Sequence, residues 1–174
     1  MASVVLSVVG SDRPGLTKAL AAAVLSAGGN WLESHLSLLG GLYVGSVLVE
    51  LAPDRFDRLR SAVQAVDAQG LEVRITSAVA ETSPVGEALH FTLVGQDRAG
   101  IVDQVTAVLS GLGANIETVE TWIDAEPHSG AALFHMDAHL RLPPALQADK
   151  VQVALQDISA EIMVDIAVTP ASPQ

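Results

Sequence analysis

Two copies of one stretch dominate this sequence. Residues 10–30, GSDRPGLTKALAAAVLSAGGN, return as residues 95–115, GQDRAGIVDQVTAVLSGLGAN, at a separation of 85 positions (10 to 95). A repeat of this length indicates that one supersecondary unit occurs twice. A chain of 174 residues then divides into two domains of roughly 80 to 90 residues each. The predicted boundaries are a first domain at 1–80, a linker at 81–87 (ETSPVGE), a second domain at 88–169 and a tail at 170–174.

Hydrophobic periodicity predicts the same succession of elements in both domains. After a short apolar strand and the repeated turn, apolar residues at i, i+4, i+7, i+8 and i+11 mark one face of a helix. Pro14 suits the first helical position, and Gly28 and Gly113 end the two helices. The predicted strands are residues 4–9, 31–38, 42–51, 71–78, 88–94, 116–123, 131–140 and 161–168, and the other predicted helices begin at Pro53 or span residues 100–111 and 144–158.

This order is β-α-β-β-α-β in each half. It predicts an α+β fold of two ferredoxin-like modules, each with an antiparallel four-stranded sheet and two helices on one face. Leu39-Gly40-Gly41 is typical of a hairpin turn between the second and third strands. The separation rises to 89 at Gly41 and Gly130, so the second hairpin loop, around Glu126-Pro127-His128, is expected to be about four residues longer.

The repeated turn leads directly into a helix. A helix start has unpaired backbone N–H groups and partial positive charge, which suit a small anion such as a carboxylate. Simpler interpretations stand beside this one. Gly15 and Gly100 have the character of turn residues, Asp12 and Asp97 of helix caps, and Asn30 and Asn115 of residues in a left-handed turn conformation. The last pair also offers hydrogen-bond donors and acceptors to a ligand.

Composition narrows the function classes. The net charge is −11, and nine Lys and Arg are too few for the phosphate neutralisation on which DNA affinity depends. The chain contains no cysteine, no apolar run long enough for a membrane helix and no basic leader, so we expect a cytoplasmic protein. No nucleophile elbow, phosphate loop, H-E-x-x-H zinc motif or dinucleotide fingerprint occurs. We therefore predict no enzyme and no cofactor.

The third strand of each half presents a different face to the side away from the helices. In the second half, His135, Asp137 and His139 alternate with apolar residues, and His90 on the neighbouring first strand can join them. Such a face is either simply solvated or a site for a divalent metal. In the first half the corresponding face is more apolar, which predicts cover by the twin module or by a second chain. Its residues are Leu42, Val44, Ser46 and Leu48.

These motifs resemble a known family. A β-α-β-β-α-β unit with G-x-D-R-x-G-[LI] after its first strand and G-[GA]-N-[WI] after its first helix is similar to the ACT domain, a regulatory module that binds small molecules. Two such units without a catalytic domain resemble the glycine cleavage system transcriptional repressors. The stretches that carry this narrower resemblance are GSDRPGL, GGNWLESHLSLLGG and GQDRAGIVDQVTAVLSGLGANIE.

The resemblance implies a ligand and its site. In ACT domains an effector, usually an amino acid, lies between paired modules, against the turn after the first strand and the start of the second. Backbone N–H groups of the turn would hold its carboxylate, and Asp12 or Asp97 its ammonium group. Amino-acid-binding ACT domains often have Asn at these two positions. The implied ligand residues are Gly10, Asp12, Pro14, Gly15, Leu16 and Asn30 in the first module and Gly95, Asp97, Gly100, Ile101 and Asn115 in the second.

Three functions remain open from the sequence. The first is a regulatory protein, expected to be a homodimer, that binds an amino acid and acts on a protein partner such as a DNA-binding regulator of glycine or one-carbon metabolism. The second is a structural or interaction subunit whose ligand sites do not function. The third is a metal-dependent enzyme that uses His135 and His139.

Overall fold

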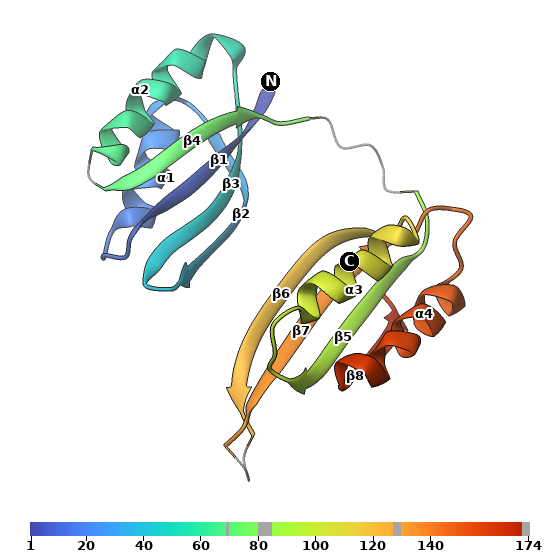
Figure 1. Ribbon diagram of the computed structural model, residues 1–174. Helices are drawn as coiled ribbons and strands as arrows, with labels where there is room; N and C mark the ends of the chain where they lie inside the picture. The colour runs from blue at the N-terminus through green and yellow to red at the C-terminus, as the bar shows by residue number, and fades with distance from the viewer. Residues whose placement is uncertain (69, 80–84, 127–129, 172–174) are drawn as a thin grey trace. The chain divides into compact units, whose positions relative to one another are not determined.

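The computed structural model describes residues 1–68, 70–79, 85–126 and 130–171 (Figure 1). The chain divides into two compact units, Met1–Glu81 and Thr82–Gln174. Residues 81–84 of the predicted linker, residues 172–174 of the predicted tail and residues 127–129 of the second hairpin loop lie outside the described residues. No helix in the described ranges is long and apolar enough to cross a membrane.

Each unit contains one four-stranded antiparallel sheet with its helices on one face (Figure 1). The strand orders are β2-β3-β1-β4 and β6-β7-β5-β8, which confirms the predicted pair of ferredoxin-like modules. The first unit contains β1 (Ala2–Ser11), α1 (Leu16–Ser26), β2 (Asn30–Leu39), β3 (Leu42–Leu51), a 3-10 turn η1 (Pro53–Arg55), α2 (Phe56–Asp67) and β4 (Leu71–Ser77). The second contains β5 (Ala88–Gln96), α3 (Ile101–Gly111), β6 (Asn115–Ala125), β7 (Ala132–Arg141), α4 (Ala148–Ile162) and β8 (Val164–Pro170).

Each unit has a hydrophobic core of its own. In the first, the apolar stripe predicted for α1 packs with Leu59 of α2 against the buried face of the sheet. In the second, Ile101, Val105 and Leu109 of α3 meet Phe91, which is fully buried on β5. No polar or charged side chain among the described residues is fully buried. Burial of apolar surface, which is the main stabilising contribution to folding, therefore occurs separately in the two units.

The helix bounds of α1, α2 and α4 differ from the prediction. The helix predicted to begin at Pro53 begins at Phe56, because Pro53–Arg55 form the 3-10 turn η1. Leu16 and not Pro14 is the first residue of α1, because Gly15 adopts φ 97° and acts as the N-cap, so Pro14 belongs to the preceding turn. α4 begins and ends four residues later than predicted, since Leu146 donates its backbone N–H to Pro143 and forms a turn first. The predicted C-terminal glycines of α1 and α3 are confirmed. Gly28 has φ 77° and Gly113 has φ 75°, as in the Schellman motif.

The second hairpin is longer than the sequence indicated. Asn30 pairs with Glu50, whereas its counterpart Asn115 pairs with Arg141, so the third strands are 91 residues apart (50 to 141). The loop is therefore six residues longer, not four as predicted from a separation of 89. A register error of two residues leaves every side chain on the same face of the sheet, because strand side chains repeat with a period of two. The prediction of which side chains face inward and which face outward is therefore unaffected by the register error.

Gly10 on β1 and Gly95 on β5 allow the paired edge strands, β4 and β8 respectively, to approach closely. A Cβ atom on Gly10 would lie 2.3 Å from the backbone oxygen of Gly70, and one on Gly95 would lie 2.5 Å from a methyl carbon of Val164. Neither contact is possible without a shift of the backbone or the side chain. These two glycines of the implied ligand site therefore have a packing role.

Replacing Gly10 by alanine should destabilise the first unit by about 1–3 kcal/mol, because the added methyl group overpacks the contact between β1 and β4. Gly111→Ala is the matched control. A Cβ atom there meets nothing within 4 Å, and the helix gains up to about 1 kcal/mol from alanine. Urea denaturation of both variants measures the two changes, which should have opposite signs. Equal stability of Gly10→Ala and the unmodified protein would contradict the packing role.

Candidate functional site

The repeated turn of the second unit ends in an exposed helix start. Gly100 has φ 97° and is the N-cap of α3, and no side chain caps the helix. The first intrahelical bond runs from the N–H of Gln104 to the carbonyl of Gly100. The N–H groups of Ile101, Val102 and Asp103 therefore have no partner within the helix. Together they form the part of the turn that suits an anion.

A pocket of about 480 Å³ lies at this helix start. Turn and helix supply most of its wall, and Phe134 from β7 supplies an aromatic side. Its lining residues are Asp97, Arg98, Gly100, Ile101, Val102, Asp103, Thr106 and Phe134. The pocket thus combines apolar surface, one guanidinium, two carboxylates and a helix N-terminus.

Arg98 supplies the positive charge of this pocket. One terminal nitrogen, Nη2, donates a 3.3 Å hydrogen bond to Oε1 of Gln104, and the buried Nε atom has no hydrogen-bond partner. A buried donor without a partner carries a desolvation cost that a ligand acceptor removes. Because guanidinium binds carboxylates in a planar geometry, the free donor beside the N-terminus of α3 favours a carboxylate ligand.

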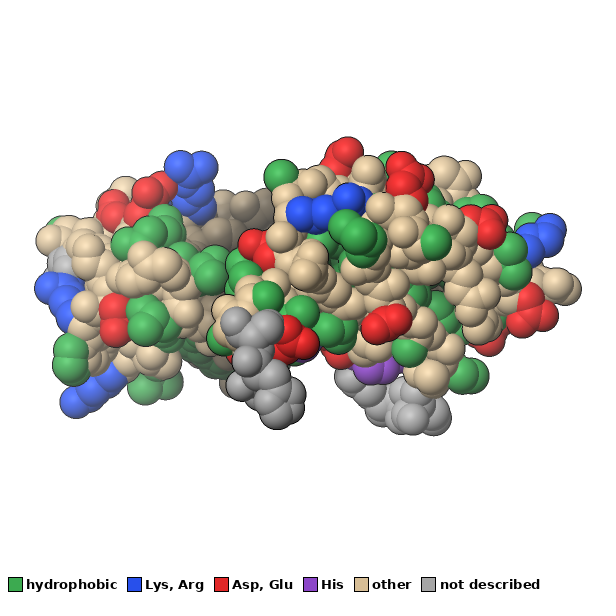
Figure 2. Space-filling model, turned by 60° about the horizontal axis from the view of Figure 1, so that its bottom comes forward, with side chains coloured by type: hydrophobic (Ala, Val, Ile, Leu, Met, Phe, Trp, Pro, Cys, Tyr) green, Lys and Arg blue, Asp and Glu red, His purple; other side chains and the backbone are tan. Residues whose placement is uncertain are grey.

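Two carboxylates at the same pocket can attract a positively charged group of the ligand. Asp97 lies at the end of β5 and Asp103 in the first turn of α3, so both lie beside the same pocket as Arg98. A simple anion would be repelled by them, whereas an ammonium group would be attracted. The pocket therefore fits a small zwitterion with an apolar side chain better than an inorganic anion. Figure 2 shows the acidic side chains that are spread over one face of the protein.

The corresponding turn of the first unit differs where it matters for binding. Its backbone is the same, with Gly15 at φ 97°. The Tyr43 hydroxyl, however, forms a 2.7 Å hydrogen bond with the Thr17 hydroxyl. By register Tyr43 corresponds to Phe134, because these residues pair with Gly10 and Gly95. The first turn thus has a polar link where the second has apolar surface, and it has Lys18 where the second has Asp103.

The predicted ligand residues do not form one site within a unit. Asp97, Gly100 and Ile101 lie together at the pocket. Asn115 lies at the other end of the sheet, since it pairs with Arg141, the partner of Ala88, while the pocket lies beyond Gln96. These ends are eight residues apart along β5, roughly 26 Å at 3.3 Å per residue. One unit therefore cannot bring both halves of the predicted site to one small ligand. The same separation holds for Asp12 and Asn30.

Two simpler interpretations are wrong. Asp12 and Asp97 are not helix caps, because glycines occupy the N-cap positions and no side chain forms a cap hydrogen bond. Asn30 and Asn115 are not in a left-handed conformation. They open β2 and β6, and Met163 is the one residue other than glycine with positive φ in the described ranges.

Four residues that line the pocket were not predicted from the sequence, namely Arg98, Asp103, Thr106 and Phe134. Arg98 belongs to an Asp-Arg pair that the repeat contains twice, and its charge is the sequence signal that identifies it. Phe134 is one of the apolar residues of the predicted strand 131–140, and only the observed register, in which it pairs with Gly95, places it beside the turn. A second pocket, of about 540 Å³, lies on the first unit and includes Val5, Leu48 and Glu33. Among the described residues that line it there is no cationic side chain to complement an anionic group.

The polar sheet face of the second unit is assembled as hydrogen-bonded and stacked pairs. His90 Nε2 lies 2.8 Å from Asp137 Oδ2, and the His90 ring stacks on that of His139 at 4.9 Å. His135 stacks on Trp122 at 5.1 Å. No three His or acidic residues in the described part of the chain are grouped so that they can hold a metal ion. The predicted placement of these histidines on one face is confirmed, and the metal interpretation finds no ligand set there.

Comparisons with known proteins connect these features to a family. The family model of the ACT domain matches residues 2–76, from β1 into β4. The solved structure of an unknown protein from Galdieria sulphuraria is 32% identical with a TM-score of 0.86, and the match covers 98% of this chain and 99% of that one. A candidate glycine cleavage system transcriptional repressor is 16% identical with a TM-score of 0.71 over 99% and 98% of the two chains, a likeness that shows the fold. No curated protein matches the sequence.

Proposed function

Because the chain belongs to the ACT domain family, whose modules generally bind amino acids and serve regulation, we propose that it is a non-enzymatic regulatory protein that binds an amino acid. The effector site is the pocket at the N-terminus of α3. The observation that carries this assignment is that Arg98, whose Nε has no hydrogen-bond partner, lines the same pocket as Asp97, Asp103 and the start of α3.

Each group of the effector has a matching group in the pocket. The α-carboxylate binds Arg98 and the N–H groups that open α3, and the ammonium group lies against Asp97 or Asp103. Ile101 and Phe134 provide apolar contact for the side chain. The positive charge of Arg98 in the same pocket offsets the negative charge that Asp97 presents to the carboxylate of an effector. The first unit has the same turn backbone, but Lys18 and Tyr43 occupy the positions of Asp103 and Phe134. The pocket of the second unit is therefore the better effector site.

The regulatory output of the proposed protein is its effect on a protein partner. We propose that the chain is a cytoplasmic homodimer and that its partner is a transcriptional regulator of glycine or one-carbon metabolism, which makes the DNA contact that a chain of net charge −11 does not. Effector binding changes the output only to the extent that the ligand prefers one arrangement of the protein over another.

A thermal-shift screen of the full chain against the twenty amino acids tests this function. An effector at 100 times its dissociation constant stabilises the protein by roughly 2.7 kcal/mol, which is a readily measured rise in Tm. We expect one or a few amino acids to raise the Tm. If none does so at millimolar concentration, the proposal that the protein binds an amino-acid effector is wrong.

The second candidate function is an interaction subunit without working ligand sites. The Thr17–Tyr43 hydrogen bond, which joins the start of α1 to β3 beside the first turn, favours it for the first unit. On this alternative, the protein partner binds equally well with and without every amino acid, and no amino acid changes the Tm.

A further inference from the structure

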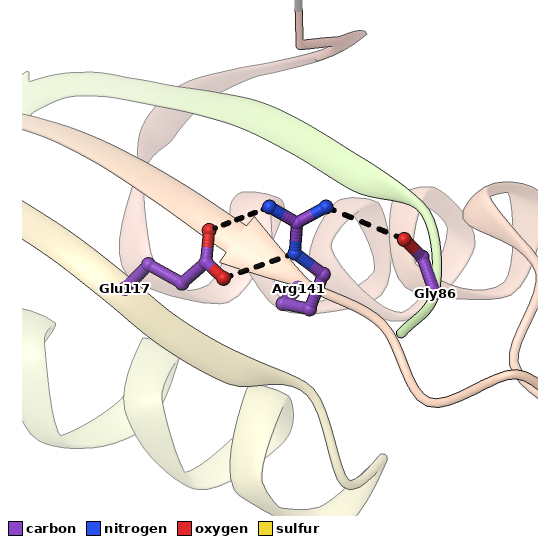
Figure 3. Close-up of polar contacts among 3 residues, drawn as sticks. All are labelled: Gly86, Glu117 and Arg141. Carbon is purple, nitrogen blue, oxygen red and sulfur yellow. Dashed lines mark hydrogen bonds and ion pairs between the residues drawn. The ribbon is translucent and has the colours of Figure 1, made fainter. Parts of the chain in front are cut away.

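Arg141, the last residue of β7, connects three segments of the second unit (Figure 3). Its Nε and Nη2 atoms donate to the two carboxylate oxygens of Glu117 at 2.9 and 3.1 Å, and Nη1 donates to the backbone oxygen of Gly86 at 3.3 Å. The Arg141 and Glu117 side chains are only 24% and 31% exposed. A bidentate, partly buried pair of this kind holds its geometry better than an exposed ion pair does.

A second contact binds the same stretch of chain. The N–H of Leu142 donates a 2.9 Å hydrogen bond to the carbonyl of Glu87. Gly86 itself has φ 115°, and a Cβ atom there would lie 1.8 Å from the carbonyl oxygen of Leu142. Gly86 and Glu87 are therefore attached to the end of β7 both by the Arg141 side chain and by backbone contact. Only glycine fits at the closest point.

The fold itself does not require this attachment. In the first unit the residue at the register position of Arg141 is Glu50, and the counterpart of Glu117 is Leu32. Both Leu32 and Glu117 occupy the irregularity where the register shifts in the second strand of their unit. Because Leu32 carries no charge, no equivalent ion pair forms at that point. Arg141 and Glu117 thus constitute an addition specific to the second unit, which is the unit that the connecting segment runs into.

We propose that Arg141 is a positioning residue that makes Gly86 and Glu87 part of the rigid second unit and so fixes the point from which the connection to the first unit departs. A fixed departure point restricts the arrangements that the two units can adopt. In a regulatory protein whose output depends on the arrangement of its modules, this restriction sets the range of states among which an effector selects. The inference concerns the effector-free protein, so it can fail independently of the proposed function.

Hydrogen exchange of the full chain tests the attachment. In Arg141→Met, the Leu142 amide should exchange about tenfold faster or more, because a hydrogen-bonded contact involving a charged group is lost beside it. Arg141→Lys keeps the charge but cannot bind Glu117 and Gly86 together, so it should restore the protection only partly. Gly86→Ala reaches the same contact from the backbone and should give the same acceleration. Arg74→Met is the matched control, since Arg74 pairs with Glu72 in the first unit.

Distances between the units test the consequence. The chain has no cysteine, so spin labels can be placed at Gln64→Cys and Gln152→Cys, both on exposed helix surface. The labelled chain is mixed with an excess of unlabelled chain, so that distances between the two copies of the proposed homodimer contribute little and the distribution reports the distance between the units of one chain. The distribution should broaden in Arg141→Met and in Gly86→Ala but not in Arg74→Met. Unchanged exchange at Leu142 would overturn the attachment. Faster exchange with an unchanged distribution would overturn the positioning role.

Discussion

Arg98→Gln should weaken binding of the amino-acid effector by about 10- to 150-fold while the fold stays intact. The guanidinium is the pocket's one cationic side chain, and hydrogen bonds to charged groups contribute about 1.5–3 kcal/mol. Glutamine keeps a hydrogen-bond donor but loses the charge and the planar fork that suit a carboxylate. Isothermal titration with the amino acid that gives the largest thermal shift measures the loss.

Arg13→Gln is the control for this prediction. Arg13 occupies the same position in the first turn, is exposed, and has no described contact that parallels the Arg98–Gln104 bond. Binding to the second-unit pocket should therefore be unchanged in this variant. If Arg13→Gln abolishes binding and Arg98→Gln does not, the effector site lies in the first unit and the assignment to the α3 pocket is wrong.

Phe91→Ala should destabilise the second unit by about 3–5 kcal/mol and leave the first unit unaffected. Phe91 is the largest fully buried side chain of its core, and truncation leaves a cavity that the surroundings fill only in part. The two cores share no residue, so the loss should remain within one unit. Tryptophan fluorescence during urea denaturation resolves the two units, because Trp31 lies in the first and Trp122 in the second.

The reciprocal variant completes this experiment. Leu6 occupies the position on β1 that Phe91 occupies on β5, and Leu6→Ala should cost about 2–5 kcal/mol in the Trp31 transition only. Trp31→Phe and Trp122→Phe backgrounds assign each transition to its reporter. A single transition that moves equally in both variants would show that the units unfold together and would contradict independent cores.

Sequence reasoning predicted the fold almost completely because the repeat and the two periodicities agree. The stripe from Leu16 to Ala27 and its copy identify the buried helix faces without any knowledge of neighbours. The errors fall where local signals compete with tertiary packing. Pro144 looked like a helix start, but Leu142 and Leu146 pack against the core first and delay the helix to Ala148.

Less of the candidate site than of the fold could be predicted from the sequence. Turn residues can be recognised locally, which is why Asp97, Gly100 and Ile101 were predicted and do line the pocket. Phe134 lies on β7, the strand that pairs directly with β5, and its position depends on a register that the alignment of Gly41 with Gly130 misplaced by two residues. Asn115 was included because the resemblance to ACT domains implies an effector against both the turn and the start of the second strand, although an entire strand length separates these two places in each unit.

The most direct test of the α3 pocket is a ¹H–¹⁵N NMR titration of the full chain with the amino acid that raises the Tm most. The effector site predicts the largest chemical-shift changes at the amides of Ile101, Val102 and Asp103 and at the Arg98 side chain. The amides of Leu16, Thr17 and Lys18, which are their counterparts in the first unit, should change little. Changes confined to the first turn, or to residues outside both turns, would contradict the account.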